Sequence, residues 1–525
     1  MKKILILVAT LLSMVSCQGF LEKRPEDFLS PANYYETETH LNTALNGVYS
    51  TLTKGGLYAN HMLGRMGLDA DEGYNLYNSD LNTVSDYNVV TTDSKILAYW
   101  VALYEGINNA NVLLANIDRP IMDENKREQI RGETLFLRAY YYLMLVSRFG
   151  DVPLILNPAP SASPEHVQIP RTPAHEVYEQ ILQDMEASSH LVPDIVEIGH
   201  GGRVSKSAVW GIMARVCLYM AGEPINDVTK YEQARNWAEK VITSGYHKLN
   251  ASFSQVFINY AQDLYDIQES IWEVEFWGNG SGLYPSNAGM VGRNNGIGNT
   301  QDESIGYAVG VLRGTRWLFE LYGSGDTRRD WTMAPFRYVG NPGVQTNWAS
   351  SAIYNRYCGK WRRIHELVSP RLAARTPQNY PLLRYSDVLL MYAEADNYVN
   401  NGPSALAYEY INQVRRRGYG KPIDSSDPDF DTSVDLADLD QDGFLKELQN
   451  ERSRELAFEC LRKSDLVRWG IFIKRMKEVM DDAMNTASTT QAKTYYTNAS
   501  ERDVIWPIPS YELGINKKLV PTPGW

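Results

Sequence analysis

The chain has 525 residues and a formal net charge of −12, and its 44% hydrophobic and 22% charged content is ordinary for a globular protein with a substantial core. An acidic chain binds polyanions poorly unless it carries a concentrated basic patch. The one short basic run of note, residues 415–417, ends a helical pattern, where it meets the negative end of the helix dipole and solvent. We therefore expect no nucleic-acid partner.

The beginning of the chain has the pattern of an export signal. Lys2 and Lys3 precede an apolar run, residues 4–15, that is too short to cross about 30 Å of hydrocarbon. Cys17 follows a small residue, which resembles a bacterial lipoprotein signal, in which the cysteine is lipidated and becomes the mature first residue. We expect residues 1–16 to be a signal peptide and residues 17–30 a lipidated tether. An incidental cysteine near an ordinary cleavage site is the alternative.

The remaining cysteines favour the lipidation of Cys17. Cys217, Cys358 and Cys460 are an odd number, lie far apart and have no CxxC spacing, so they predict neither a disulfide framework nor a zinc site. Acyl chains contribute about 0.8 kcal/mol per buried CH₂, so a multiply acylated terminus holds a folded body at a membrane. No later segment is long and apolar enough to cross a bilayer, so we expect a tethered protein.

Most of the chain after this leader places apolar residues at helical spacing. The predicted helical segments are residues 38–52, 98–117, 127–150, 205–222, 231–249, 384–400 and 403–418. Ala234, Ala238 and Val241 lie on one face of their segment and would let a neighbouring helix approach closely. The pairs 205–249 and 384–418 resemble tetratricopeptide hairpins without a strict repeat period, and ordinary antiparallel helix pairs are the alternative.

Two stretches interrupt the helical pattern. The chain becomes loop-rich between residues 271 and 372, where residues 278–300 hold seven Gly and five Asn. A shorter polar and aromatic stretch, residues 69–92, lies between the first two helical segments. Long irregular connections are usually disordered or functional, and the many aromatic residues argue against disorder. We expect one mainly α-helical scaffold that carries two irregular, ligand-sized elaborations.

Six segments occur in an order that is similar to one known family. The leader runs into FLEKRPEDFLSPANYYETETHLNTALNGVY, and LRAYYYLMLVSRFGDVPL, YPLLRYSDVLLMYAEADN, NQVRRRGYG, NERSRELAFECLRKSDLVRWG and WPIPSYELGINKKLVPTPGW follow. Together they resemble the SusD/RagB family, the surface lipoproteins of Bacteroidetes nutrient-uptake systems. Cys460 and Lys463 stand where that family commonly has a glycine and an aromatic residue, which concerns helix packing.

The resemblance covers nearly all of the mature chain and implies the fold, location and partners. The implied fold is mainly α, with four tetratricopeptide-like units and a loop-rich, partly β ligand-binding side. Its helical N-terminal region would span residues 31–270 and its C-terminal region residues 271–525, with 271–372 as a loop-rich insertion. The implied location is the exterior of the cell outer membrane, where a SusC-like TonB-dependent transporter receives glycans, or peptides in some members.

A glycan site needs exposed aromatic rings for the flat C–H faces of sugars, and amides or charges for the hydroxyl groups at their edges. The two irregular stretches supply both kinds of side chain. The candidates are Asp71, Tyr74, Asn75 and Tyr77 in the first stretch and Trp277, Tyr284, Asn287, Arg293 and Asn294 in the second, with Trp331 and Trp348 as further options. We expect only a minority of them to contact ligand, because most aromatic residues are packed in cores.

Glu273 and Glu275 are the clearest candidates for a catalytic carboxylate pair. On a predicted strand they share a face with their Cα atoms about 6.6–6.8 Å apart. Glycosidase carboxylates must flank a bond from opposed positions, which two neighbours on one strand cannot readily do. We therefore interpret them as an exposed strand face, with Trp272, Val274 and Phe276 on the other face.

Two further acidic patterns have structural interpretations. Glu451, Glu455 and Glu459 recur at helical spacing among several arginines, which predicts an ion-pair lattice holding this helix against its neighbours. DLDQDGFLKELQ resembles the start of an EF-hand loop but has Gln449 where the bidentate glutamate belongs. We therefore expect Asp442 to cap a helix beginning near residue 444, with a weak calcium site as the alternative.

Walker A, HExxH and GxSxG sequences are absent, so we expect no enzyme, no cofactor and no metal. The leading hypothesis is a lipid-anchored surface protein that binds an oligosaccharide and delivers it to a SusC-like transporter. Three alternatives remain open: a peptide-binding member of the same family, a surface glycoside hydrolase, and a scaffold whose helical repeats bind only proteins.

Overall fold

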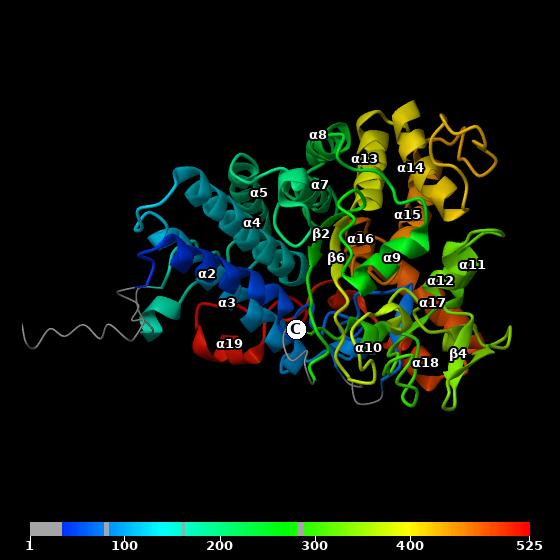
Figure 1. Cartoon of the computed structure of the whole chain (residues 1–525). Helices are drawn as coiled ribbons and strands as arrows, with labels where there is room; N and C mark the ends of the chain where they lie inside the picture. The colour runs from blue at the N-terminus through cyan, green and yellow to red at the C-terminus, as the bar shows by residue number, and fades with distance from the viewer. Residues whose placement is uncertain (1–33, 78–82, 160–162, 282–287) are drawn as a thin grey trace, which may run out of the picture.

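The computed structural model describes residues 34–77, 83–159, 163–281 and 288–525, which form a mainly α-helical body (Figure 1). Within these ranges, no helix has the length and apolar character needed to span a membrane. The predicted signal peptide, the tether and Cys17 lie outside the described residues.

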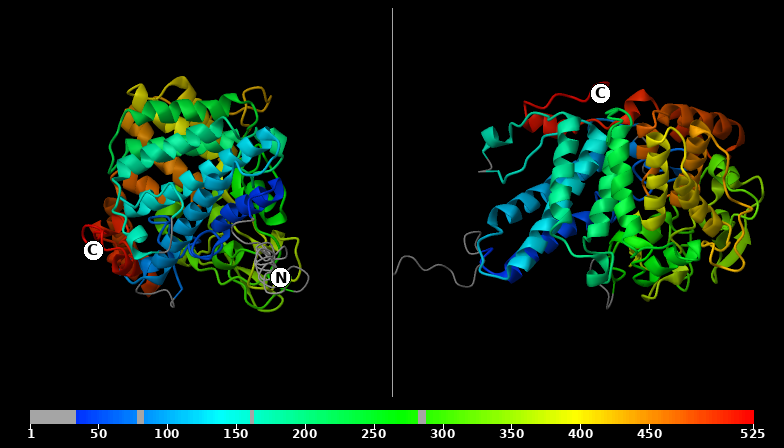
Figure 2. Two further views of the ribbon diagram at one scale, coloured as in Figure 1. Left: turned by 90° about the vertical axis from the view of Figure 1, so that its left-hand side faces the viewer. Right: turned by 90° about the horizontal axis from the view of Figure 1, so that it is seen from above.

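The scaffold is a series of long helices, each packed against the next. They are α2 (Glu38–Tyr49), α3 (Ser94–Asn116), α4 (Glu124–Phe149), α5 (Ala174–Ser189), α7 (Lys206–Ala221), α8 (Lys230–Thr243), α13 (Tyr385–Val399) and α14 (Ala405–Gly418). Contacts join α2 to α3, α3 to α4, α4 to α5, α5 to α7, α7 to α8, α8 to α13, and α13 to α14. Figure 2 shows this row of helices from above. Because α8 contacts α13 directly, the row of helices is continuous, and the chain between α8 and α13 lies outside the row.

Local sequence explains where these helices begin and how they pack. The side chain of Asp93 accepts hydrogen bonds from the backbone of the first turn of α3, and Ser205 does the same for α7. Helix α7 is apolar on nearly every side because it lies between α5 and α8. Ala234, Ala238 and Val241 of α8 are fully buried, which confirms the predicted close approach of a neighbouring helix.

The rest of the chain forms shorter elements. After the row these are α15 (Gln441–Leu456), α16 (Arg462–Arg468), α17 (Phe472–Thr486), α18 (Thr490–Asn498) and α19 (Ser510–Ile515). Between α5 and α13 they are α6 (Ile195–Ile198), α9 (Phe253–Gln262), β2 (Ser270–Val274), α10 (Val291–Asn295), β3 (Leu312–Gly314), α11 (Arg316–Leu321), α12 (Arg328–Thr332), β4 (Phe336–Val339), β5 (Val344–Asn347) and β6 (Tyr380–Arg384). The predicted mainly α fold with a small β component is confirmed.

Three two-stranded antiparallel sheets connect distant parts of the chain. Strand β1 (Gly73–Asn75) pairs with β3, with Tyr74 opposite Arg313. Strand β2 pairs with β6, and β4 pairs with β5. The first pairing holds the stretch 69–92 against the segment around residue 312, so the two irregular stretches predicted from sequence meet through a backbone ladder.

A buried lattice of ion pairs lies beneath these elements. Glu455 is fully buried and accepts hydrogen bonds from Arg417 (2.6 Å), Arg384 (2.8 Å) and Arg328 (3.2 Å). Glu451 and Glu459 of the same segment are also buried and paired. The predicted lattice is confirmed, although most partners come from α12, β6 and α14 rather than from the same helix.

The helix α15 begins earlier than expected. It starts at Gln441, and its N-cap is Asp440, whose side chain accepts from the backbone N–H of Gly443 at 2.8 Å. The prediction that Asp442 caps this helix is therefore wrong by two residues. An aspartate two residues earlier has the same capping chemistry, so the sequence pattern alone did not separate the two.

Candidate ligand-binding surface

The first candidate aromatic residue, Tyr74, lies in the core. Only 1% of it is exposed, and its hydroxyl donates to the carbonyl oxygen of Tyr354 at 2.8 Å and lies 3.0 Å from Thr489 Oγ1. Burial raises its pKa to about 12. A ring so placed fixes β1 against the C-terminal helices and does not present a face to solvent.

Asp71 is also structural. It is fully buried and bonds Arg462 through both carboxylate oxygens, at 2.7 and 3.0 Å, and Arg475 at 3.0 Å. Burial alone would raise the pKa of Asp71, but the two guanidinium groups hold it below its ordinary value. These ion pairs therefore hold the first irregular stretch against α16 and α17.

Tyr77 is the exposed member of the first stretch, with 38% of its surface accessible. The buried side chain of Asn75 accepts a hydrogen bond from the backbone N–H of Tyr77 at 2.6 Å, which fixes the turn that carries it. The guanidinium carbon of Arg65 lies over the ring, 5.4 Å from its centroid. An aromatic ring beside a guanidinium group is therefore presented at the surface.

The second stretch approaches the same place through α10. The side-chain amide of Asn294 donates to Asn60 Oδ1 at 3.0 Å, and Arg65 donates to the same oxygen at 3.4 Å. Arg293 donates in turn to Asn294 Oδ1 at 2.9 Å. Asn294 is fully buried, so the prediction that it contacts ligand is wrong, and its amide instead connects neighbouring side chains. Asn60, Arg65, Tyr77, Arg293 and Asn294 thus form one connected group, which we call the Tyr77 cluster.

Backbone hydrogen bonds hold the two halves of this cluster in register. The N–H of Val311 donates to the carbonyl of Asn294 at 2.6 Å, and the N–H of Leu76 donates to the carbonyl of Val311 at 2.8 Å. Val311 therefore lies between the residue next to Tyr77 and the end of α10. Positions held by main-chain bonds on both sides are pre-organised, which lowers the entropy lost on binding a ligand.

Three other predicted residues are placed outside this connected group or outside the described residues. Trp277 is 48% exposed and follows strand β2, so it offers a ring to solvent. Tyr284 and Asn287 lie outside the described residues. The assignment of all three to the ligand site stays a prediction.

The two further tryptophans pack against arginine side chains. The guanidinium of Arg362 lies 4.0 Å from the centroid of Trp331, and that of Arg337 lies 5.0 Å from the centroid of Trp348. Trp331 also borders a cleft of about 390 Å³ beside α9 and α12. Both rings are partly covered, whereas 48% of Trp277 is exposed.

The two glutamates of strand β2 differ from the expected exposed face. Glu273 is only 3% exposed, and its carboxylate accepts from Ser270 Oγ at 2.5 Å and from Asn379 at 3.0 Å. Burial raises its pKa to about 7. Glu275 alone meets solvent, beside His200 at 3.1 Å. The exposed-face interpretation is wrong for Glu273, because the chain at residue 201 covers it and pairs with its backbone.

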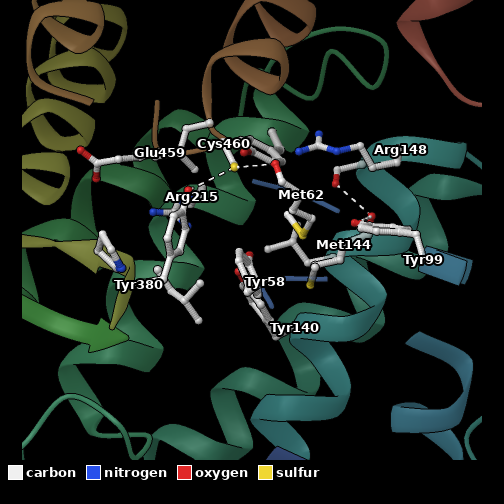
Figure 3. Close-up of a pocket in the computed structure, with 16 residues that line it drawn as sticks. Tyr58, Met62, Tyr99, Tyr140, Met144, Arg148, Arg215, Tyr380, Glu459 and Cys460 are labelled. Atoms are coloured by element: carbon white, nitrogen blue, oxygen red, sulfur yellow. Dashed lines mark hydrogen bonds between the residues drawn. The ribbon is translucent and has the colours of Figure 1, made fainter. Parts of the chain in front are cut away.

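The cavity drawn in Figure 3 is too small for a sugar. It has a volume of about 40 Å³ and lies between α4, α7 and the segment around Cys460. A separate cleft of about 800 Å³ is lined by α3, α19 and the segments 153–159 and 166–169, and none of the predicted site residues within the described ranges lines it. The Tyr77 cluster remains the described surface at which both predicted stretches meet.

Asn60, Arg65 and Asn295 were missed by reading the sequence. The amide of Asn295 is 1% exposed, and neither its nitrogen nor its oxygen has a hydrogen-bond partner in the described structure. Gly64 has a φ of +72° and lies so close that a Cβ there would be 2.9 Å from Asn295 Oδ1. The glycines around Arg65 were the available signal, because a glycine often marks close backbone approach.

These features define a mainly α-helical protein whose irregular side carries a pre-organised aromatic and polar cluster. The family model described as "SusD family" matches residues 268–525, and the model described as "Starch-binding associating with outer membrane" matches residues 19–218. The chain belongs to the SusD/RagB family, as the resemblance predicted.

Individual relatives agree along nearly the whole chain. SusD-like protein P25 of Formosa agariphila is 26% identical, covering 99% of this chain and 98% of that protein. The starch-binding protein SusD of Bacteroides thetaiotaomicron is 24% identical over 85% of this chain and 82% of that protein. The crystal structure of a SusD homolog from Bacteroides thetaiotaomicron has a TM-score of 0.85 at 27% identity, covering 94% of this chain and 98% of that one. The family supports a carbohydrate-binding role in association with the outer membrane.

Proposed function

We propose that this protein binds an oligosaccharide at the Tyr77 cluster, with the exposed ring of Trp277 as a separate contact, and delivers it to a SusC-like TonB-dependent transporter. The lipidated Cys17 would tether it to the outer membrane with its binding side facing the exterior. The protein acts by binding and transfer, without breaking a bond in its ligand.

The observation that carries this proposal is the meeting of the two irregular stretches. Tyr77 comes from the first stretch and Asn294 from the second, and Asn60 and Arg65 connect them through hydrogen bonds and a ring contact. Asn294 itself is fully buried, so the groups that this surface offers to a sugar are the ring of Tyr77 and the half-buried side chains of Asn60 and Arg65. An aromatic face with an amide and a guanidinium group at its edge suits the apolar faces and hydroxyl rims of sugars.

The positions of Glu273 and Glu275 argue against the hydrolase alternative. Glu273 is buried and hydrogen-bonded within its own sheet, and Glu275 lies beside His200 on the protein surface. The two carboxylates therefore do not face each other across a space that a glycosidic bond could occupy.

The test is a calorimetric titration of purified protein with a panel of oligosaccharides and peptides. The ligands are then analysed for products of hydrolysis. We expect binding of at least one glycan without release of product. Tyr77→Ala and Trp277→Ala should each weaken binding by about tenfold, equal to about 1.4 kcal/mol. Tyr511→Ala, at another exposed tyrosine, is the matched control and should bind normally.

Two outcomes would overturn this function. Binding of peptides with no response to any glycan would indicate the peptide-binding alternative. Release of shortened oligosaccharide that disappears in Glu275→Gln would indicate a hydrolase. Co-purification of the tagged protein with a TonB-dependent transporter tests the partnership separately, and loss of membrane association in Cys17→Ala tests the anchor.

A further inference from the structure

Helix α5 opens with the segment HEVYE, in which His175 and Glu179 are four residues apart. Residues at this spacing are neighbours on one face of a helix. It is also the spacing of the two histidines in a HExxH zinc motif, with Glu179 in the place of the second histidine. Two side chains of metal-ligating type therefore lie on one face of α5, although the motif itself is absent.

The fold brings a third side chain of this type to the same face. Asp227 lies in the connection between α7 and α8, and α7 packs against both α5 and α8 (Figure 1). Its Oδ2 atom is 3.9 Å from His175 Nε2, and Glu179 Oε1 is also 3.9 Å from that nitrogen. One ligand atom from each of the three side chains lies within 4.8 Å of the other two. Three potential ligands thus converge on one point.

These separations suit a shared ion better than direct hydrogen bonds. At 3.9 Å the His175 nitrogen is beyond hydrogen-bond distance of either carboxylate oxygen. Zinc binds histidine nitrogen at about 2.0–2.1 Å and carboxylate oxygen at about 2.0–2.2 Å, so two such bonds span up to about 4.2 Å. An ion between His175 and either oxygen is therefore within bonding reach of both atoms. Small rotations of these partly exposed side chains complete the set.

Neighbouring residues hold both carboxylates in place. Thr229 donates to Asp227 Oδ1 from its hydroxyl at 2.6 Å and from its backbone N–H at 3.2 Å, and the other oxygen, Oδ2, is the one near His175. The ammonium of Lys230 is buried and donates to Glu179 Oε1 at 2.7 Å. A carboxylate oxygen has two lone pairs, so this hydrogen bond leaves one for a metal. Hydrogen bonds of this kind orient the ligands of metal sites.

The charge and the donor atoms of the group suit a divalent transition metal. The two carboxylates outnumber the single ammonium of Lys230, so the group keeps a net negative charge toward a cation. An imidazole nitrogen with two carboxylate oxygens is a ligand set for zinc, whereas calcium and magnesium prefer oxygen ligands throughout. The side chain of His175 is 52% exposed, so solvent can supply a water molecule as the fourth ligand.

We propose that His175, Glu179 and Asp227 form a binding site for a zinc ion, which ties the start of α5 to the connection between α7 and α8. The sequence led us to expect no metal, because Asp227 is far from α5 along the chain and only the fold places it there. The ion stabilises the row of helices. It is separate from the proposed glycan surface.

The experiment is a calorimetric titration of purified protein, first freed of metal with a chelator, with zinc. We expect one equivalent to bind saturably, and cobalt bound in its place to give visible d–d absorption. His175→Ala and Asp227→Asn should each weaken binding at least about tenfold, because even the loss of a group that orients a ligand has this effect. His190→Ala, at the exposed histidine that follows α5, is the matched control and should bind zinc as the native protein does.

Two further measurements do not depend on affinity alone. Saturating zinc should raise the thermal unfolding midpoint of the native protein and of His190→Ala by a few degrees, and leave that of His175→Ala unchanged, because only a folded site gains stability from its ligand. Crystals of the native protein soaked in zinc should show an anomalous peak between His175 Nε2 and Asp227 Oδ2.

The proposal is overturned if zinc does not bind saturably, which would leave His175 as a cation paired with the two carboxylates. It is equally overturned if His175→Ala and Asp227→Asn bind zinc as the native protein does, since the ion would then lie elsewhere. If a variant does not fold, the anomalous peak decides the question, and its absence between these atoms refutes the site. Glycan affinity measured in the presence of chelator tests the proposed function by itself, so the two proposals fail separately.

Discussion

Replacing Glu455 by glutamine tests whether the buried ion-pair lattice holds the scaffold together. The carboxylate contacts Arg417, Arg384 and Arg328 at 2.6, 2.8 and 3.2 Å, and it is fully buried. Burial opposes ionisation, but the surrounding cations hold the pKa of Glu455 far below its ordinary value. Glu455→Gln keeps the shape of the side chain and leaves three buried guanidinium groups with one anion fewer.

The expected loss follows from these contacts. A charged hydrogen bond contributes about 1.5–3 kcal/mol, and the glutamine oxygen can still accept some of the three bonds. Removing one partner from a buried ion pair costs about 3–5 kcal/mol, and we expect Glu455→Gln to lower the free energy of unfolding by about this amount. Because the folded-state pKa is depressed, the stabilisation is present above the unfolded pKa and is lost as the pH falls.

The measurement is chemical denaturation at neutral pH, followed by intrinsic fluorescence, for the native protein and two variants. Glu320→Gln is the matched control, because Glu320 pairs with Arg316 at 3.5 Å but is 62% exposed. We expect the control to change the free energy of unfolding by less than about 1 kcal/mol. Equal midpoints for the native protein and Glu455→Gln would show that the lattice does not stabilise the fold.

Three further predictions concern single residues. Tyr74→Phe should lower the free energy of unfolding by about 1 kcal/mol in denaturation, yet leave the glycan affinity from calorimetry unchanged, since its hydroxyl is used inside the core. Gly64→Ala should lower the free energy of unfolding by about 1–2 kcal/mol and weaken glycan binding, because the φ of Gly64 is +72° and the new Cβ would meet Asn295. Gly47→Ala is the control: its Cβ would enter open space, so it should change neither stability nor binding. The pKa of Glu273 is raised from 4.5 to about 7, so the native protein should lose about 2–3 kcal/mol of its free energy of unfolding as the pH rises through this window. Glu273→Gln should lose less in denaturation series between about pH 5 and pH 8. Parallel curves for the two proteins would contradict the burial argument.

The helical scaffold was predictable because its signal is local. Apolar spacing located the long helices, and the small face of Ala234 and Ala238 anticipated a close helix contact that the structure has. The lattice around Glu451, Glu455 and Glu459 was also predictable, because acidic residues at helical spacing among several arginines have ion-pair partners within reach. Sequence did not identify the partners, because Arg328 and Arg384 are brought in from elements far along the chain.

The candidate site was predictable only as two stretches. Tyr74 and Tyr77 are three residues apart and chemically alike, yet Tyr74 is buried on strand β1, which pairs with β3, and Tyr77 is exposed. Their difference is decided by Tyr354 and Thr489, which sequence could not place beside them. Glu273 was assigned to an exposed face for the same reason, because the covering chain near residue 201 contacts it only in the folded molecule.

The ties between Asp71 and the C-terminal helices have a consequence for how the protein is made. Asp71 meets Arg462 at a sequence separation of 391 residues, and the Ala70 carbonyl accepts from Tyr496 at a separation of 426. Contacts of such long range form late, because a large loop must close before they stabilise anything. The stretch bearing Tyr77 therefore cannot reach its final shape until almost the whole chain has been synthesised. A chain that is cut short before α16 would lack a finished surface near its beginning, however well its first helices had folded.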